Sequence, residues 1–430
     1  MPVGLRVRLR IFVTSLVTGL VIAVCSPAQA KPTYPSSGTC DGLPRIDVTT
    51  PAGFCVGLVA QDLTYPRGVL PLKNGDLLVA DLGGWVENRG TVWLLKKTTS
   101  GYQKHKLLEK LDRPNAIVRG PDGLIYVGLV GRIMRFDLRD PKATLTDVVG
   151  GNSQVSALPG TGRHPLTAMI FDRHGDLYVN VGSSTDHCEQ ENNQAPNPSQ
   201  VCPETQGDNP RGVIRKYTMQ WPTGTVKNWV NYAFGLRNSM ALAFQPNSDI
   251  LWQAENSRDA IHRAMPGLAN DNDLPHDELN RVVQGAHYGW PTCFDNNLSS
   301  PEYPQADCSR FKAPVRLLPA HAAPLGMVFY EGLQFPAAFR QSLIIAYHGY
   351  RSHGHRIVAL MADDTGAPLG KKIDLVSGWG ARKNQAMGAP VDIKMGTDGA
   401  LYLAEDRNGT ILTVRYVGTV VTIASAAKRP

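Results

Sequence analysis

The chain has 430 residues, of which 42% are hydrophobic and 19% are charged, and its net charge at neutral pH is +7. The basic residues are scattered along the chain rather than gathered in blocks, which argues against a nucleic-acid-binding protein. No apolar run after the first thirty residues is long enough to cross a bilayer, so we expect no membrane span.

Residues 1–30 have the pattern of an export signal. Arg6, Arg8 and Arg10 precede an apolar run, and the small-residue motif AQA ends at Ala30. Cleavage after Ala30 would remove the three arginines and lower the net charge from +7 to +4. We therefore expect a periplasmic or secreted mature protein.

Six cysteines follow that cleavage point, and an even number in an oxidising compartment predicts disulfides. They fall into three local pairs separated by 15, 14 and 15 residues. Although six cysteines allow about fifteen pairings, we predict the local bridges Cys40–Cys55, Cys188–Cys202 and Cys293–Cys308, each worth about 3 kcal/mol. No C-x2-C spacing occurs, which argues against a zinc site.

One phrase recurs along the chain: a polar turn followed by a strand of alternating or wholly apolar residues. Six copies occur, NGDLLVAD from Asn74, DGLIYVGL from Asp122, HGDLYVNVG from His174, NSDILWQAE from Asn247, RQSLIIAY from Arg340 and DGALYLAE from Asp398. Asn-Gly, Asp-Gly and His-Gly supply the positive φ that such turns require. Helical periodicity is almost absent, and HKLLEKL from His105 is at most a short exception.

Six such units predict an all-β, six-bladed β-propeller with long disulfide-stapled loops on one face, since propellers repeat short antiparallel sheets around an axis. Two stacked sandwich domains are the alternative. The expected organisation is a signal peptide over 1–30, an N-terminal segment over 31–64 that closes onto the propeller, the propeller over 65–418, and a tail over 419–430. The longest loops, 185–211 and 256–324, contain four of the cysteines, which favours ordered and functional loops.

Three stretches carry candidate chemistry. His164 lies just before an alternating strand, and imidazole suits proton abstraction near neutral pH, although a lone histidine is more often structural. Arg237–Asn238 precedes another strand and offers a planar donor fork beside a donor and acceptor, although a turn with a surface charge explains it as well.

The third stretch is an acidic loop. Asp271, Asp273, Asp277 and Glu278 lie within eight residues and are hard oxygen ligands that suit calcium. The spacing is not that of an EF-hand, and a solvated acidic loop is the plainer interpretation. Composition and spacing alone leave both open.

Taken together, three motifs resemble the glucose/sorbosone dehydrogenase family, over roughly Tyr65 to Tyr416. They are H-x(6)-F-D-x-x-G-D-L-Y-V-x-V-G-S-S from His164, G-L-R-N-S-x-x-L-A-F from Gly235, and D-E-L-N-x-x-x-x-G-x-x-Y-G-W-P from Asp277. The resemblance is closer to the sorbosone-dehydrogenase-like branch. It implies an exported β-propeller that uses pyrroloquinoline quinone and Ca2+.

The same resemblance implies roles for individual residues. His164 falls on the catalytic base, which takes the sugar hydroxyl proton as hydride moves to the quinone. Arg237 and Asn238 fall on a pair that contacts the polar edge of the quinone, and Arg351 lies roughly at a basic cofactor contact.

The metal ligands also come from the resemblance. Glu278 falls on a glutamate that binds a structural calcium. Ser257 and Arg258 lie where backbone carbonyls hold the calcium of the cofactor, so both are candidate carbonyl donors.

Several residues depart from the pattern of the glucose enzymes of this family. Arg163 and Ser183 stand where those enzymes carry aspartates, before the catalytic histidine and after the strand. The stretch 387–393, MGAPVDI, lacks the two arginines expected near the last blade, and Arg382 and Lys383 lie out of register. These departures argue against glucose as the substrate and leave tight quinone binding less secure than the fold.

The resemblance therefore implies a quinone-dependent enzyme that oxidises a sugar, or a related hydroxyl or aldehyde, and passes electrons to a separate acceptor. A calcium-dependent propeller lactonase is one alternative, and it needs side-chain carboxylates on an axial calcium. A non-catalytic propeller that binds a sugar or a protein is another. The residues that converge on the axis distinguish these possibilities.

Overall fold

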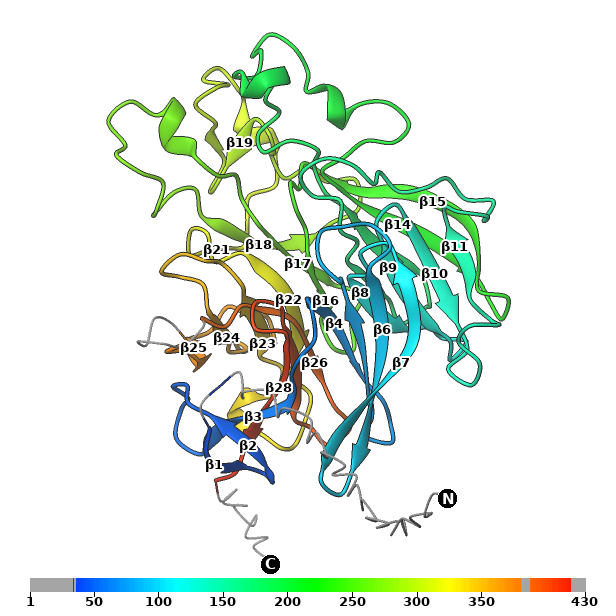
Figure 1. Ribbon diagram of the computed structural model, residues 1–430. Helices are drawn as coiled ribbons and strands as arrows, with labels where there is room; N and C mark the ends of the chain where they lie inside the picture. Colours follow the sequence, from blue (N-terminus) through cyan, green and yellow to red (C-terminus); the bar gives the residue numbers. More distant parts are fainter. Residues whose placement is uncertain (1–33, 35, 380–386, 419–430) are drawn as a thin grey trace, which may run out of the picture. The chain divides into compact units, whose positions relative to one another are not determined.

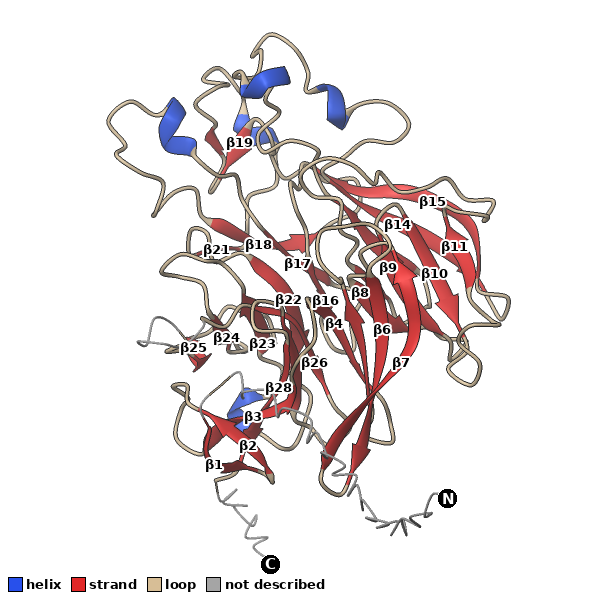
Figure 2. Ribbon diagram, in the orientation of Figure 1, coloured by secondary structure: helices blue, strands red, loops and turns tan. Residues whose placement is uncertain are grey.

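The computed structural model describes residues 34, 36–379 and 387–418. The predicted signal peptide, the C-terminal tail, and Arg382 and Lys383 lie outside these residues. Strands and loops make up most of the described chain (Figure 2). Within it, no helix is long and apolar enough to cross a membrane.

The described residues form six four-stranded antiparallel blades, which confirms the predicted six-bladed β-propeller (Figure 1). From inner to outer strand, the first three blades are β4 (Pro66–Pro71), β5 (Leu77–Asp81), β6 (Gly90–Thr98) and β7 (Gly101–Leu111); β8 (Ala116–Arg119), β9 (Ile125–Leu129), β10 (Arg132–Phe136) and β11 (Thr146–Val149); and β12 (Met169–Phe171), β13 (Leu177–Val181), β14 (Val213–Gln220) and β15 (Thr225–Phe234).

The next two blades repeat this order. They are β16 (Ala241–Phe244), β17 (Leu251–Glu255), β18 (Asp277–Val282) and β21 (Arg316–Leu318); and β22 (Pro324–Phe329), β23 (Leu343–Tyr347), β24 (Arg356–Leu360) and β25 (Lys372–Val376).

The sixth blade joins the two ends of the described chain. Its inner strands are β26 (Pro390–Met395), β27 (Leu401–Glu405) and β28 (Thr410–Tyr416), and β3 (Phe54–Ala60) pairs with β28 from outside. The hairpin of β1 (Ser36–Cys40) and β2 (Leu43–Ile46) extends this sheet beyond β3. An N-terminal strand therefore completes the blade that the C-terminal strands begin.

The second strand of every blade is buried along its whole length, because neighbouring blades cover both of its faces. These six strands are the apolar halves of the recurring phrase, and the polar turn before each one links it to the inner strand. The turn needs a residue in the left-handed region, which Gly75 supplies at φ 87° in the first blade and Asn247 at φ 56° in the fourth.

The stretch HKLLEKL, with its trace of helical periodicity, lies in the strand β7. Strand β7 pairs with β6 along its whole length and is the outermost strand of its blade. Leu108 and Leu111 are buried, whereas Lys106 and Lys110 are exposed, as expected for an outermost strand with one face to solvent. Tertiary pairing here overrides local propensity.

The long loops gather at one end of the propeller, near β19 in Figure 1. They carry the short hairpin of β19 (Cys293–Phe294) and β20 (Leu298–Ser299) and the 3-10 turns η1 (Glu191–Asn193), η2 (Pro203–Thr205), η3 (Ile261–Ala264) and η4 (Cys308–Arg310). A fifth turn, η5 (Ala337–Phe339), lies between β22 and β23. All three predicted disulfides are formed, and two of them close these loops.

Candidate functional site

His164 is held at the entrance of the third blade. Its backbone N–H donates to the carbonyl of Ser183 at 3.1 Å, and that of Arg163 donates to the carbonyl of Ser184 at 2.8 Å. The segment before the inner strand β12 therefore lies against the segment after β13. Gly182 permits this approach, because a Cβ there would come within 2.6 Å of the Cβ and carbonyl oxygen of His164.

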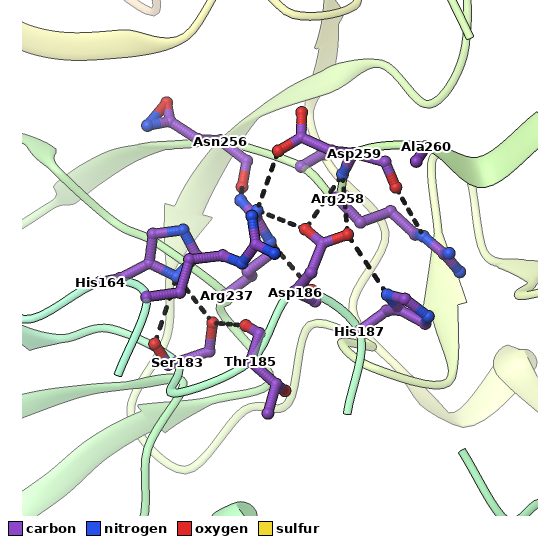
Figure 3. A network of polar contacts seen from close by, with 12 residues as sticks. His164, Ser183, Thr185, Asp186, His187, Arg237, Asn256, Arg258, Asp259 and Ala260 are labelled. Atoms are coloured by element: carbon purple, nitrogen blue, oxygen red, sulfur yellow. Dashed lines mark hydrogen bonds and ion pairs between the residues drawn. The ribbon is translucent and has the colours of Figure 1, made fainter. Parts of the chain in front are cut away.

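The contacts of His164 define its tautomer (Figure 3). Nδ1 lies 2.8 Å from Oγ of Ser183 and 3.2 Å from its carbonyl oxygen. The Ser183 hydroxyl donates its own proton to the carbonyl of Thr185 at 2.6 Å, so its Oγ is left to accept from Nδ1–H. In the described part of the chain every hydrogen bond of this ring runs through Nδ1, and Nε2 keeps its lone pair.

The same ring is uncharged at neutral pH. Burial, followed by the positive charge of Arg237, lowers the pKa of His164 well below 6.5. A neutral imidazole with a bare Nε2 is the form that can accept a proton.

Arg237 lies on the turn between β15 and β16, and its guanidinium is buried in a set of acceptors. Nε donates to the carbonyl of Asp186 at 3.0 Å and Nη1 to the carbonyl of Asn256 at 2.8 Å. Nη2 forms an ion pair with Oδ1 of Asp186 at 2.5 Å, and the two side chains are 3% and 6% exposed. Three of the five guanidinium N–H bonds have acceptors at hydrogen-bond distance, and Nη2 also forms a longer ion pair with Oδ2 of Asp259, at 3.7 Å.

Asp186 is the anionic partner in this network. Burial alone would raise its pKa, but the hydrogen bond with His187 and the charge of Arg237 lower it far below the ordinary value. Its carboxylate also accepts the backbone N–H of Asp259 at 3.0 Å, and so ties the loop after β13 to the loop after β17.

Asn238 lies beside Arg237 and is 8% exposed. Its Oδ1 is buried without a hydrogen-bond partner among the described residues. A Cβ at Gly182 would lie 3.4 Å from that oxygen, which places it on the same side as His164. An unpaired buried acceptor costs free energy unless a ligand or water satisfies it, so it marks space for a polar group.

Arg351 is linked to the same network through Asp271. Its guanidinium binds the Asp271 carboxylate through two contacts, at 2.8 and 3.2 Å. The carboxylate also accepts the backbone N–H of Ala260 at 2.7 Å, directly after Asp259. The sequence placed Asp271 in a calcium-type acidic cluster, whereas here it holds an arginine.

The four carboxylates of that acidic stretch do not converge. Asp273 is exposed on the loop, while Asp277 and Glu278 lie in the buried strand β18. Asp277 accepts the backbone N–H groups of Ser257 and Ala323 at 2.8 and 2.6 Å. Burial raises its pKa to about 7.

Glu278 faces Glu255 across the strands β17 and β18. Burial raises the pKa of Glu255 to about 8, and burial together with the charge of Glu255 raises that of Glu278 well above its ordinary value. Oε2 of Glu255 and Oδ1 of the adjacent Asn280 are buried without partners among the described residues. Two facing carboxylates with spare oxygen acceptors fit a calcium ion, which takes six to eight oxygens.

The carbonyl oxygens of Ser257 and Arg258 are the predicted donors to the calcium of the cofactor. In the described chain no hydrogen bond ends at the carbonyl oxygen of either residue. The Arg258 guanidinium is turned aside to Glu302, at 2.5 Å, in an ion pair whose side chains are each 5% exposed. Both carbonyls are therefore available to a cation.

A separate buried network occupies the axis. Arg67 donates to Asp406 at 2.6 Å and to Asn115 at 3.0 Å, and His348 lies 3.1 Å from Asp406. These residues were not predicted from the sequence, because their isolated positions give little signal beyond Asp406 following a buried strand. Because Arg67 neutralises the axial carboxylate, this arrangement does not favour the axial calcium that a lactonase needs.

The predicted residues thus meet in one connected region. Arg237, Asn238 and His164 lie together. Arg351 is connected to them by its ion pair with Asp271. Glu278 is connected through its strand neighbour Glu255, whose Oε1 accepts the backbone N–H of Arg237 at 2.7 Å. The second N–H of Arg237 Nη1, the unpaired amide oxygen of Asn238 and the carbonyls of Ser257 and Arg258 fit a planar polar cofactor with a divalent cation. The two arginines are already paired with aspartates, so they bring hydrogen bonds rather than net positive charge.

The fold and the site together indicate a β-propeller protein with a polar binding site beside the axis, built from His164, Arg237 and Asn238. The model of the glucose/sorbosone dehydrogenase family matches residues 128–413, and the chain belongs to that family.

The relatives with a named activity share about a quarter of their aligned residues with this chain. The chain is 24% identical over 284 residues to the pyrroloquinoline quinone-dependent sugar dehydrogenase of Hypocrea jecorina, covering 63% of this chain and 60% of the relative. It is 26% identical over 290 residues to the aldose sugar dehydrogenase YliI of Escherichia coli, covering 64% and 66%. Across four curated relatives the chain spans between 36% and 66% of their length.

Solved structures share the fold. The holo form of the pyranose dehydrogenase PQQ domain from Coprinopsis cinerea superposes with a TM-score of 0.65, covering 87% of this chain and 98% of that one. The sequence identity is 20%, so this likeness concerns the fold alone.

Proposed function

We propose that the protein is an exported quinoprotein that oxidises a sugar, or a related hydroxyl or aldehyde substrate, by hydride transfer to pyrroloquinoline quinone. The observation that carries the proposal is the neutral His164 ring with a bare Nε2 beside Arg237 and Asn238. The names of the Hypocrea and Escherichia relatives support a sugar dehydrogenase.

The cofactor would be held by Arg237, Asn238 and Arg351, with calcium on the carbonyls of Ser257 and Arg258. Glu278 would bind a second, structural calcium together with Glu255. When bound, pyrroloquinoline quinone would supply the hydride acceptor and calcium would supply Lewis acidity.

The protein contributes the base. Nε2 of His164 takes the proton of the substrate hydroxyl, and positive charge develops on the ring. The hydrogen bond from Nδ1–H to Ser183 keeps Nε2 turned toward the substrate. The ion pair with Asp186 offsets the charge of Arg237, so the imidazolium forms beside a nearly neutral pair rather than a bare cation.

The remaining parts of the proposal concern organisation and partners. Residues 1–30 are removed on export, and residues 31–64 close onto the propeller of 65–418. A separate acceptor receives the electrons. The substitutions Arg163 and Ser183 point away from glucose and toward another sugar or aldehyde.

Reconstitution tests the proposal. The purified protein is incubated with pyrroloquinoline quinone and Ca2+ and assayed with a panel of sugars and an artificial electron-accepting dye. Dye reduction should require both additions. His164→Asn should lower turnover by about 10²–10⁴-fold, with quinone binding within a few-fold of wild type, whereas Arg237→Ala should weaken quinone binding first.

Two outcomes would count against this function. If no sugar or aldehyde reduced the dye through the reconstituted protein, the dehydrogenase assignment would be wrong. If His164→Asn turned over its substrate at the wild-type rate, the base would lie elsewhere.

A further inference from the structure

A cavity of about 840 Å³ lies between the two disulfide-closed loops, apart from the His164 site. One wall comes from residues 198–206 and the other from residues 287–311. Both segments belong to the loops gathered near β19 in Figure 1. Its volume falls within the range of about 300–1,000 Å³ that is typical of small-molecule sites.

The walls are fixed before any ligand arrives. The disulfide Cys188–Cys202 closes the first loop and Cys293–Cys308 closes the second, and Cys202 itself lines the cavity. A preformed cavity loses less conformational entropy on binding than a flexible loop does. The two disulfides therefore favour the interpretation of this cavity as a ligand-binding site.

Four flat rings line the cavity. Trp290 and Tyr303 are each 6% exposed and form its floor, while Phe311 stacks on His287 with 4.5 Å between ring centres. Burial, together with the charge of Arg310, lowers the pKa of His287 to about 4, so its ring is neutral. Nδ1 of His287 accepts the N–H of Gly289, which leaves Nε2–H as a donor.

Carboxamides complete the lining. Gln200, Gln206 and Gln305 offer both donors and acceptors, and Arg310 adds a planar cation. Among the described residues that line the cavity, none is acidic, which argues against a cationic ligand or a metal ion. Rings that stack on an apolar C–H face, beside amides that bind hydroxyls, match the surface of a neutral sugar.

We propose that this cavity is an accessory binding site for a neutral oligosaccharide. The proposal goes beyond the dehydrogenase function and does not depend on it, because binding here needs neither cofactor nor turnover. It assigns the two disulfide-closed loops a role as saccharide-binding walls.

The floor of the cavity also contacts the residues that position Arg237. The indole N–H of Trp290 donates to the carbonyl of Asp186 at 3.1 Å, and that same oxygen accepts Nε of Arg237. The backbone N–H of Trp290 donates to the carbonyl of Gly235, two residues before Arg237. An oligosaccharide held here would rest against the turn that carries the dehydrogenase residues.

Calorimetric titration of the disulfide-intact protein, without quinone, tests the proposal. The probes are maltotriose, cellotriose and chitotriose, with decylubiquinone as an apolar comparison. At least one trisaccharide should bind, and Phe311→Ala should weaken it about tenfold through loss of ring stacking. Gln305→Ala, at an exposed position, should weaken it several-fold. Two control variants should bind the trisaccharide as tightly as wild type. They are His164→Asn, in the dehydrogenase site, and Leu333→Ala, at an exposed side chain of another loop.

Three results would overturn the proposal. One is the absence of trisaccharide binding at millimolar concentration. Another is binding that His164→Asn abolishes while Phe311→Ala and Gln305→Ala retain it, because the sugar would then occupy the dehydrogenase site. The third is tight binding of decylubiquinone with no saccharide binding. None of these readouts involves dye reduction, so they are independent of the proposed activity.

Discussion

Replacing Asp186 with asparagine should destabilise the protein strongly. The ion pair with Arg237 is buried, with side chains 3% and 6% exposed and 2.5 Å between Nη2 and Oδ1. Removing one charge of a buried pair costs about 3–5 kcal/mol when the other charge is left unpaired. Here Arg237 would keep only the longer ion pair with Asp259, at 3.7 Å, whose side chain is 52% exposed. Asparagine keeps an oxygen that can accept the Asp259 N–H, so we expect a loss near about 3 kcal/mol, the lower end of that range.

Urea unfolding of disulfide-intact protein, followed by tryptophan fluorescence, measures this loss. Asp249→Asn is the matched control, because its ion pair with Arg173 has side chains 56% and 55% exposed. Exposed pairs contribute about 0.2–1 kcal/mol. If the two variants lost equal stability, Asp186 would not be balancing a buried charge.

A second variant isolates the cause of the loss. In Asp186→Leu combined with Arg237→Met, both charges are gone and no buried ion is left unpaired. This double variant should be more stable than Asp186→Asn, since replacing a buried pair by apolar residues is often neutral or stabilising. A double variant less stable than the single one would contradict this explanation.

Other predictions concern pH, calcium and the disulfides. Because the pKa of His164 lies well below 6.5, kcat/KM of the reconstituted enzyme should stay level as pH falls through 6.5. Ser183→Asp should raise that pKa and move the acidic decline in kcat/KM to higher pH. Equal pH profiles for the two proteins would argue against an interaction of residue 183 with His164. Chelation with EGTA should lower the melting temperature of wild type more than that of Glu278→Gln, and a response of equal size in both would place the structural calcium elsewhere. Replacing Cys188 and Cys202 together with serine should lower the free energy of unfolding by about 3 kcal/mol, measured in urea, and an unchanged midpoint would show that the bridge contributes nothing.

The sequence predicted the features that depend on local pattern. The polar turn and apolar strand recur because the second strand of every blade follows a tight turn and is buried on both faces. Leu77–Asp81 and Leu401–Glu405 are examples of such strands, and both are wholly buried. The three disulfides were predictable for a related reason, since each joins cysteines that are close in sequence.

The charge pairing of the candidate site was not predictable. Arg237 and Asp186 are 51 residues apart, and Arg67 and Asp406 are 339 residues apart. Which charges meet depends on how the blades are arranged around the axis, and no spacing along the chain encodes that. The motifs therefore identified Arg237 but not the aspartate that neutralises it.

The pairing of β3 with β28 determines when the protein can finish folding. Strand β3 ends at Ala60, but its partner begins at Thr410, so about 350 residues must be made before the sixth blade can close. Until then one edge of β3 has unpaired backbone groups, which invite aggregation. The hairpin of β1 and β2, tied by Cys40–Cys55, covers only the opposite edge. Synthesis order thus makes the earliest strand of the propeller the last to be completed.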